Sequence, residues 1–167
     1  MATIMIAETL FSWASSIPPW LATIVLSALP ITECRLTIPV AILSWHLSPI
    51  AAYVLAMIGN AIPIAPIFFG FQWFRSWAAK YAPWSTKWLD RIIDHAHSKL
   101  GKQYEQYGIV ALVVLSAIPI PGGGIWTGAL AAVALKISWK RSWLALVGGM
   151  LIMGAILLAV TMIGKTV

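Results

Sequence analysis

ATIVLSALPI at Ala22–Ile31 and ALVVLSAIPI at Ala111–Ile120 are two copies of one stretch of this sequence. At a constant offset of 89 residues, seven of the ten positions are identical, including a shared Leu-Ser-Ala-x-Pro-Ile. The same offset pairs Gly59 with Gly148. Because such a motif in one register is more than similar composition, we interpret the chain as an internal duplication.

The composition is that of an integral membrane protein. Hydrophobic residues make up 60% of the 167 residues and charged residues only 10%, which is too little charge to cover a globular surface. The runs 36–74, 106–135 and 142–164 lack Asp, Glu, Lys and Arg. Each exceeds the roughly 20 residues needed to cross a hydrocarbon core, and the first is too long for one crossing. The net charge is +6, and the basic residues are interleaved with Trp. This pattern favours lipid headgroups over nucleic acid as the binding partner.

The first copy predicts a re-entrant helix hairpin over residues 20–47. An arm over 20–29 rises only about 15 Å as a helix, half of the core, before Pro30 disfavours its continuation. A return arm over 36–46 then carries the chain back to the same side. A hairpin of two short arms around a polar tip explains the charged residues inside an apolar block.

A transmembrane helix over 49–74 follows, in which Gly59-Asn60 and two prolines predict a kink with the amide facing protein or a cavity. The second copy repeats the plan, with a hairpin over 107–135 and a transmembrane helix over 142–164. Between the copies, residues 75–106 alternate Trp with basic residues and predict an amphipathic linker on the membrane surface.

Residues 1–19 have apolar positions at helical spacing and end in Pro18-Pro19. We expect an interfacial amphipathic helix there, with a full crossing as the alternative.

The placement of basic residues distinguishes two hairpins from the rival topology of four ordinary crossings. With two hairpins and two crossings, six basic residues of the linker and three of the turn after the second hairpin share one face. The positive-inside rule favours this arrangement, with both termini outside the cytoplasm. The fold class is therefore an all-α polytopic membrane protein built from two inverted repeats.

The first tip contains Glu33 and Arg35. A carboxylate at membrane depth is costly unless it is paired, hydrated or protonated, so Glu33 is a candidate for proton exchange or a fixed partner within the tip. Arg35 either holds an anionic substrate or neutralises Glu33. Two residues apart on a helix they would not face each other, so direct pairing requires a non-helical tip.

The second tip replaces charge with bare backbone. Its members are Pro119, Pro121, Gly122, Gly123 and Gly124. Consecutive N–H groups form anion nests and glycines permit close approach, although a tight turn that packs small residues is the alternative. If both tips meet near the midplane, two helix N-termini point at one volume and favour an anionic group, with Asn60 lining it.

Several motifs carry the resemblance to a known family: Glu33-x-Arg35-x-x-Ile38-Pro39, Gly59-Asn60, Tyr107-Gly108 and Pro119-x-Pro121-Gly-Gly-Gly-x-Trp126-x-Gly128-Ala129. From about Trp20 to Gly149 the chain resembles the prokaryotic small multidrug export protein family. That family is distantly similar to the DedA superfamily, whose members have paired re-entrant hairpins and include proton-dependent lipid-carrier flippases. The resemblance implies export or flipping across the plasma membrane, with Glu33 and Arg35 at the charged hairpin positions.

We therefore expect a small multi-pass transporter of the prokaryotic plasma (inner) membrane. Its predicted function is proton-coupled export or flipping of an amphiphilic or anionic lipid-like substrate, with no cofactor and no metal. The alternative is a non-transporting membrane protein that binds anionic lipid or a partner through its linker. An enzyme is not favoured, since the sequence offers no nucleophile with a base. A homodimer is expected, because two crossings and two hairpins enclose little volume.

Overall fold

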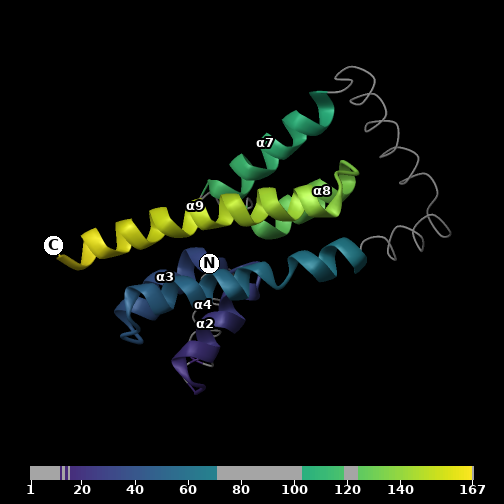
Figure 1. Cartoon of the computed structure of the whole chain (residues 1–167). Helices are drawn as coiled ribbons and strands as arrows, with labels where there is room; N and C mark the ends of the chain where they lie inside the picture. The colour runs from purple at the N-terminus through teal and green to yellow at the C-terminus, as the bar shows by residue number, and fades with distance from the viewer. Residues whose placement is uncertain (1–11, 13, 15, 71–102, 119–123, 167) are drawn as a thin grey trace, which may run out of the picture. The chain divides into compact units, whose positions relative to one another are not determined.

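The computed structural model describes residues 12, 14, 16–70, 103–118 and 124–166, and every regular element in them is a helix (Figure 1). The predicted all-α class is confirmed for this part of the chain. The predicted interfacial helix over 1–19 and the linker over 75–106 lie almost wholly outside the described residues. So do four residues of the second tip, Pro119, Pro121, Gly122 and Gly123.

Three helices form in the first half of the chain: α2 (Pro19–Ala28), α3 (Glu33–Leu43) and α4 (Pro49–Ala61). α2 and α4 begin with a proline, whose missing N–H has no partner in a first turn anyway. Leu29, which precedes Pro30, is extended with ψ 144° and ends α2, as the steric effect of the proline ring predicts. α2 packs against both α3 and α4, so the chain folds back on itself in the predicted place.

The return arm begins earlier than predicted. α3 starts at Glu33 rather than at residue 36 and ends at Leu43. The backbone N–H of Glu33 donates to the Leu29 carbonyl at 3.0 Å, and the N–H of Leu36 donates to Thr32 at 3.2 Å. These hydrogen bonds extend the helix into the tip, so the charged residues lie in the first turn of α3.

The second half contains α7 (Gln103–Ala117), α8 (Ile125–Ala134) and α9 (Trp139–Thr166). α8 ends in a Schellman motif, in which Lys136 adopts a left-handed φ of 55°. The N–H groups of Lys136 and Ile137 donate to the carbonyls of Val133 and Ala132, each at 3.0 Å. The turn between α8 and α9 is thereby closed by backbone bonds.

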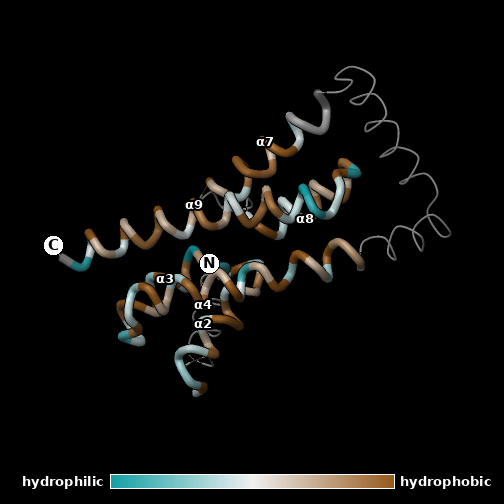
Figure 2. Tube along the Cα trace, in the orientation of Figure 1, coloured by the Kyte–Doolittle hydropathy of each residue, from teal (hydrophilic) through white to brown (hydrophobic). Residues whose placement is uncertain are grey.

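Two helical stretches are long and apolar enough to cross a membrane, Pro49–Gly70 and Trp139–Lys165. Their outer faces expose large aliphatic side chains at a spacing of four residues, and Figure 2 shows apolar residues along both. On the first stretch these are Ile50, Val54, Ile58 and Ile62, and on the second Ile152, Ile156 and Val160. Such stripes are unfavourable in water and suit lipid. The protein is therefore a membrane protein, as its composition predicts.

The first of these stretches is broken where the sequence predicts a kink. α4 ends at Ala61, a turn occupies residues 62–63, and helix resumes at residue 64. Pro63 has no N–H to donate to the Gly59 carbonyl, which accepts from Ile62 at 3.2 Å instead. The predicted kink is confirmed.

The chain forms two compact units, Met1–Ile62 with Met150–Val167, and Pro63–Gly149. Each unit contains a close contact at a glycine, made by Gly59 in the first and by Gly149 in the second, which is one residue after Gly148, the offset partner of Gly59. In the first, a β-carbon on Gly59 would overlap the carbonyl of Ile24 and lie 2.9 Å from Cβ of Ser27. In the second, a β-carbon on Gly149 would meet Val113 and Ser116.

Ile24 and Val113, like Ser27 and Ser116, are related by the offset of 89 residues. The residues that face the glycine are therefore equivalent in the two copies, whereas the glycines themselves are displaced by one residue. In both copies, the helix that carries the repeated motif packs closely against a glycine of the following long helix.

The neighbouring glycines of α9 test this contact. Gly149→Ala should lower the free energy of unfolding by about 1–3 kcal/mol, the usual cost of overpacking, because the new methyl group meets the Val113 backbone. Gly148→Ala is the matched control, since nothing lies within 4 Å of a β-carbon there. Thermal unfolding of the detergent-solubilised protein measures both. Equal unfolding temperatures for the two variants would contradict the packing described here.

Candidate functional site

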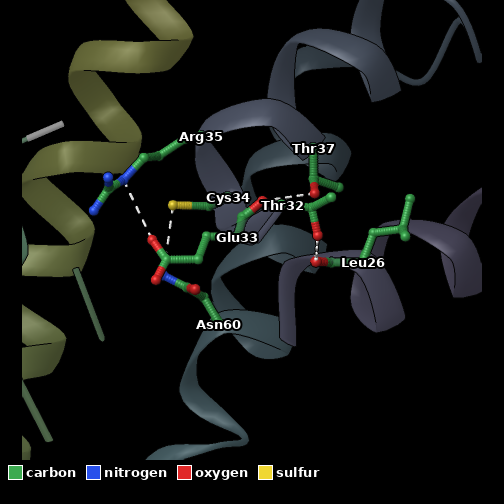
Figure 3. A network of polar contacts seen from close by, with 7 residues as sticks. All are labelled: Leu26, Thr32, Glu33, Cys34, Arg35, Thr37 and Asn60. Atoms are coloured by element: carbon green, nitrogen blue, oxygen red, sulfur yellow. Dashed lines mark hydrogen bonds and ion pairs between the residues drawn. The ribbon is translucent and has the colours of Figure 1, made fainter. Parts of the chain in front are cut away.

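The first tip is closed by its own hydrogen bonds. The Thr32 hydroxyl donates to the carbonyl of Leu26, one turn before the end of α2 (Figure 3). Thr32 is only 1% exposed, so this bond lies inside the protein, where it strongly favours one conformation of the tip. The tip therefore holds the start of α3 in a fixed orientation.

Glu33 has a left-handed backbone with φ 44°, although it is not a glycine. This conformation is uncommon for such residues and is maintained only when the surroundings enforce it. It turns the Glu33 side chain away from its helical direction and towards Arg35, whose Nε lies 3.2 Å from Oε2 of Glu33. Both residues lie in the first turn of α3, and the left-handed backbone of Glu33 departs from regular helix geometry, so the pair forms where a regular helix would not allow it.

The ion pair is buried. The side chain of Glu33 is 5% exposed and that of Arg35 is 15% exposed. Within the described residues, Oε2 of Glu33 has no hydrogen bond of acceptable geometry despite its distance to Arg35. The pair is thus held by charge attraction without good alignment, which leaves the carboxylate able to accept a further donor.

Asn60 lies beside this pair, on α4. It is fully buried, so its amide faces protein and not lipid, as predicted. Its Nδ2 lies 3.5 Å from Sγ of Cys34, and Figure 3 shows the side chains of Asn60 and Glu33 pointing toward each other. Oδ1 of Asn60 has no hydrogen-bond partner among the described residues.

Ser27 is a further buried polar residue, which lies next to Gly59, the neighbour of Asn60 in the sequence, and the sequence analysis did not include it. It is fully buried on α2, against Gly59 of α4, and its Oγ has no hydrogen-bond partner in the described part of the chain. The sequence does point to Ser27, because it is the polar residue of the shared Leu-Ser-Ala-x-Pro-Ile motif. We call Ser27, Glu33, Cys34, Arg35 and Asn60 the polar cluster.

The second tip is described only from Gly124, which is the N-cap of α8. Its φ of 99° and ψ of −163° are open only to glycine. Its N–H donates to the carbonyl of Leu115 at 3.2 Å, and Leu115 is the duplicate of Leu26. In both copies the same leucine carbonyl therefore accepts a hydrogen bond from the tip.

Gly128 lies at a close contact between two helices. A β-carbon on it would lie 2.5 Å from Cδ2 of Leu146, so α8 and the start of α9 lie close together here. Small residues of this kind allow two helices to approach closely.

Of the predicted site residues, the polar cluster contains Glu33, Arg35 and Asn60. The approach of the second tip, and the roles of Pro119, Pro121, Gly122, Gly123 and Gly124, stay predictions. Chemically, the cluster offers a carboxylate that can take a proton and a guanidinium that can hold an anion. It also offers two neutral oxygen atoms, on Ser27 and Asn60, that have no hydrogen-bond partner among the described residues.

Fold and site together define a small helical membrane protein with a buried charged pair in the first turn of α3. Residues 33–156 match the model of a family described as "Putative small multi-drug export protein". The match covers well over half of the chain, which therefore belongs to this family. Neither a curated protein nor a solved structure matches the chain.

The ion pair is tested by a double-mutant cycle. Arg35→Met should lower the free energy of unfolding by about 1–3 kcal/mol, because it leaves the Glu33 carboxylate buried without its counter-charge. Adding Glu33→Gln should recover part of that loss, since the buried charge is then gone. Thermal unfolding in detergent of the wild type, both single variants and the double variant gives the coupling energy. Strictly additive effects would show that the two side chains do not interact.

Proposed function

We propose that the protein is a proton-coupled exporter or flippase of small amphiphilic or anionic lipid-like molecules in the prokaryotic plasma membrane. The single observation that carries the proposal is the Glu33–Arg35 pair, buried inside a membrane protein. Burying two charges costs more than their attraction returns in most proteins, so such a pair is kept for what it does. The family's description as an export protein supports the same function.

The proposed topology has two re-entrant hairpins, α2–α3 and α7–α8, and two crossings. It makes the halves inverted repeats whose tips meet near the midplane. Two observations support it: α2 (10 residues) and α8 (10 residues) are too short to cross the bilayer, and the helix order short, short, long occurs twice. A relation to the DedA superfamily, which we include in the proposal, would imply paired hairpins as well. A homodimer would complete the enclosure of the substrate.

Competition for Arg35 supplies the proposed coupling. When Glu33 is ionised, its carboxylate occupies the guanidinium of Arg35. When Glu33 binds a proton, Arg35 loses its counter-charge and can hold the anionic group of a substrate instead. Because proton and substrate are linked through one guanidinium, each raises the affinity for the other by the same factor. Proton and anion would therefore cross together, so this coupling supports flipping by co-transport and not export in exchange for a proton. The glycine tip around Gly124 would supply backbone N–H donors to the same anion.

Glu33→Gln tests the proton step. The full chain is reconstituted in liposomes with a fluorescently labelled phosphatidylglycerol, and its flipping is followed with and without an imposed pH gradient. Glu33→Gln should lower the rate about tenfold or more and remove the response to the gradient, since the amide cannot exchange a proton. A linker variant, Lys87→Gln with Arg91→Gln, is the matched control and should keep its activity.

Two results would count against transport through this site. One is normal flipping by Glu33→Gln, and the other is no flipping by the wild type. Either favours the alternative, a membrane protein that binds anionic lipid or a partner through the basic linker. Loss of activity in the linker variant alone would favour it further.

Ser27→Ala tests whether the free hydroxyl of the polar cluster serves the substrate pathway. We expect slower flipping with an unchanged unfolding temperature, because no protein partner is lost. Ser116→Ala is the matched control, since the hydroxyl of Ser116 already donates within its own helix, to Leu112 at 2.8 Å. It should leave the flipping rate unchanged, while the loss of this hydrogen bond should lower the unfolding temperature slightly. Equal effects of both variants on flipping would remove Ser27 from the proposed site.

A further inference from the structure

A second feature lies away from the polar cluster, at the start of α9. Four side chains, Trp139, Lys140, Trp143 and Leu144, line an open hollow of about 310 Å³. Trp139 and Trp143 are four residues apart, as are Lys140 and Leu144, so both pairs follow one face of the helix. Trp143 is 39% exposed and Leu144 is 66% exposed. An apolar floor with one cation is thus open to the surroundings.

Trp139 is held in place by aromatic packing. Its ring lies edge-on to Phe68, with ring centroids 4.8 Å apart and planes at 74°. Phe69 packs against the other part of the same indole, at a centroid distance of 5.4 Å. Such pairs prefer these tilted and edge-to-face geometries. One wall of the hollow is therefore built and does not depend on a ligand.

The charged residues that adjoin the hollow in the sequence are all basic. Lys136, Lys140 and Arg141 lie within six residues of one another, and the sequence from Tyr107 to Val167 contains no Asp or Glu. The side chain of Lys140 is exposed. A cation on an apolar, Trp-lined surface is complementary to an anion that carries its own apolar part.

The position along α9 favours the membrane surface. The stretch Trp139–Lys165 has 27 residues, which exceeds the roughly 20 needed for the hydrocarbon core. Its first turns therefore lie at one interface, where Trp and Lys are the preferred residues.

We infer that this hollow, formed by Trp139, Lys140, Trp143 and Leu144, is a binding site for an anionic phospholipid of the surrounding membrane. Lys140 holds the phosphate, the indoles lie at the level of the glycerol and ester groups, and Leu144 contacts the acyl chain. The volume suits a headgroup and not the acyl chains, which remain in the bilayer. This site is separate from the polar cluster and does not depend on transport.

The test is a lipid titration of the full chain in detergent. Dihexanoyl phosphatidylglycerol should raise the unfolding temperature in a saturable way, because a ligand that binds only the folded state stabilises it. Dihexanoyl phosphatidylcholine should have a smaller effect. Lys140→Gln should weaken the apparent affinity for the anionic lipid about fivefold, the expected loss for one Lys contact. Lys165→Gln, at the other end of the same helix, is the matched control and should bind normally.

Trp143→Leu provides a second variant that keeps apolar bulk but removes the indole, and it should also weaken binding. Any of three results would overturn the inference. They are equal stabilisation by both lipids, unchanged affinity in Lys140→Gln, and an equal shift produced by inorganic phosphate. A shift that follows a change in oligomeric state on size-exclusion chromatography would assign the hollow to contacts between copies instead.

Discussion

A charge cannot be left unpaired in a protein that is surrounded by lipid, and this constraint shapes the first hairpin. Glu33 is 4% exposed, so its counter-charge must come from within reach of the tip. Arg35 meets it only because Glu33 adopts a left-handed backbone, which the Thr32 and Leu29 hydrogen bonds support. The strain of one residue is thus offset by the pairing of two charges. The backbone conformation of Glu33, its pairing with Arg35 and the burial of both side chains therefore depend on one another.

The sequence predicts the helices well, because a lipid environment allows the backbone few conformations. A backbone in hydrocarbon must be helical, and breaks occur where proline or glycine permits them. Pro30 ends α2, and Pro63 interrupts the first long stretch, both in the predicted places. The start of α3 was predicted three residues late, because Thr32 completes the turn with its side chain. That hydrogen bond depends on how the tip folds, which residue patterns do not show.

The site was predicted in part, for a similar reason. Glu33 and Arg35 are conspicuous because charge is rare in this chain, and Asn60 because an amide interrupts an apolar run. Ser27 was missed since a serine in a membrane helix commonly satisfies its hydroxyl on its own backbone. Thr23 and Ser116 do so in this protein. Ser27 differs because its hydroxyl has no hydrogen-bond partner among the described residues, and residue patterns in the sequence do not show this.

The two copies have kept their packing and diverged in their chemistry. Ser27 and Ser116 occupy the same place beside a glycine, yet the Ser116 hydroxyl is bonded within α7 while that of Ser27 is not. Glu33, likewise, corresponds by the offset of 89 to Gly122. A duplicated scaffold whose close contacts need only glycine and backbone leaves the tips free to change. The first tip carries charged side chains, whereas the second is rich in glycine. An arginine side chain and consecutive peptide N–H groups are two different ways to bind an anion.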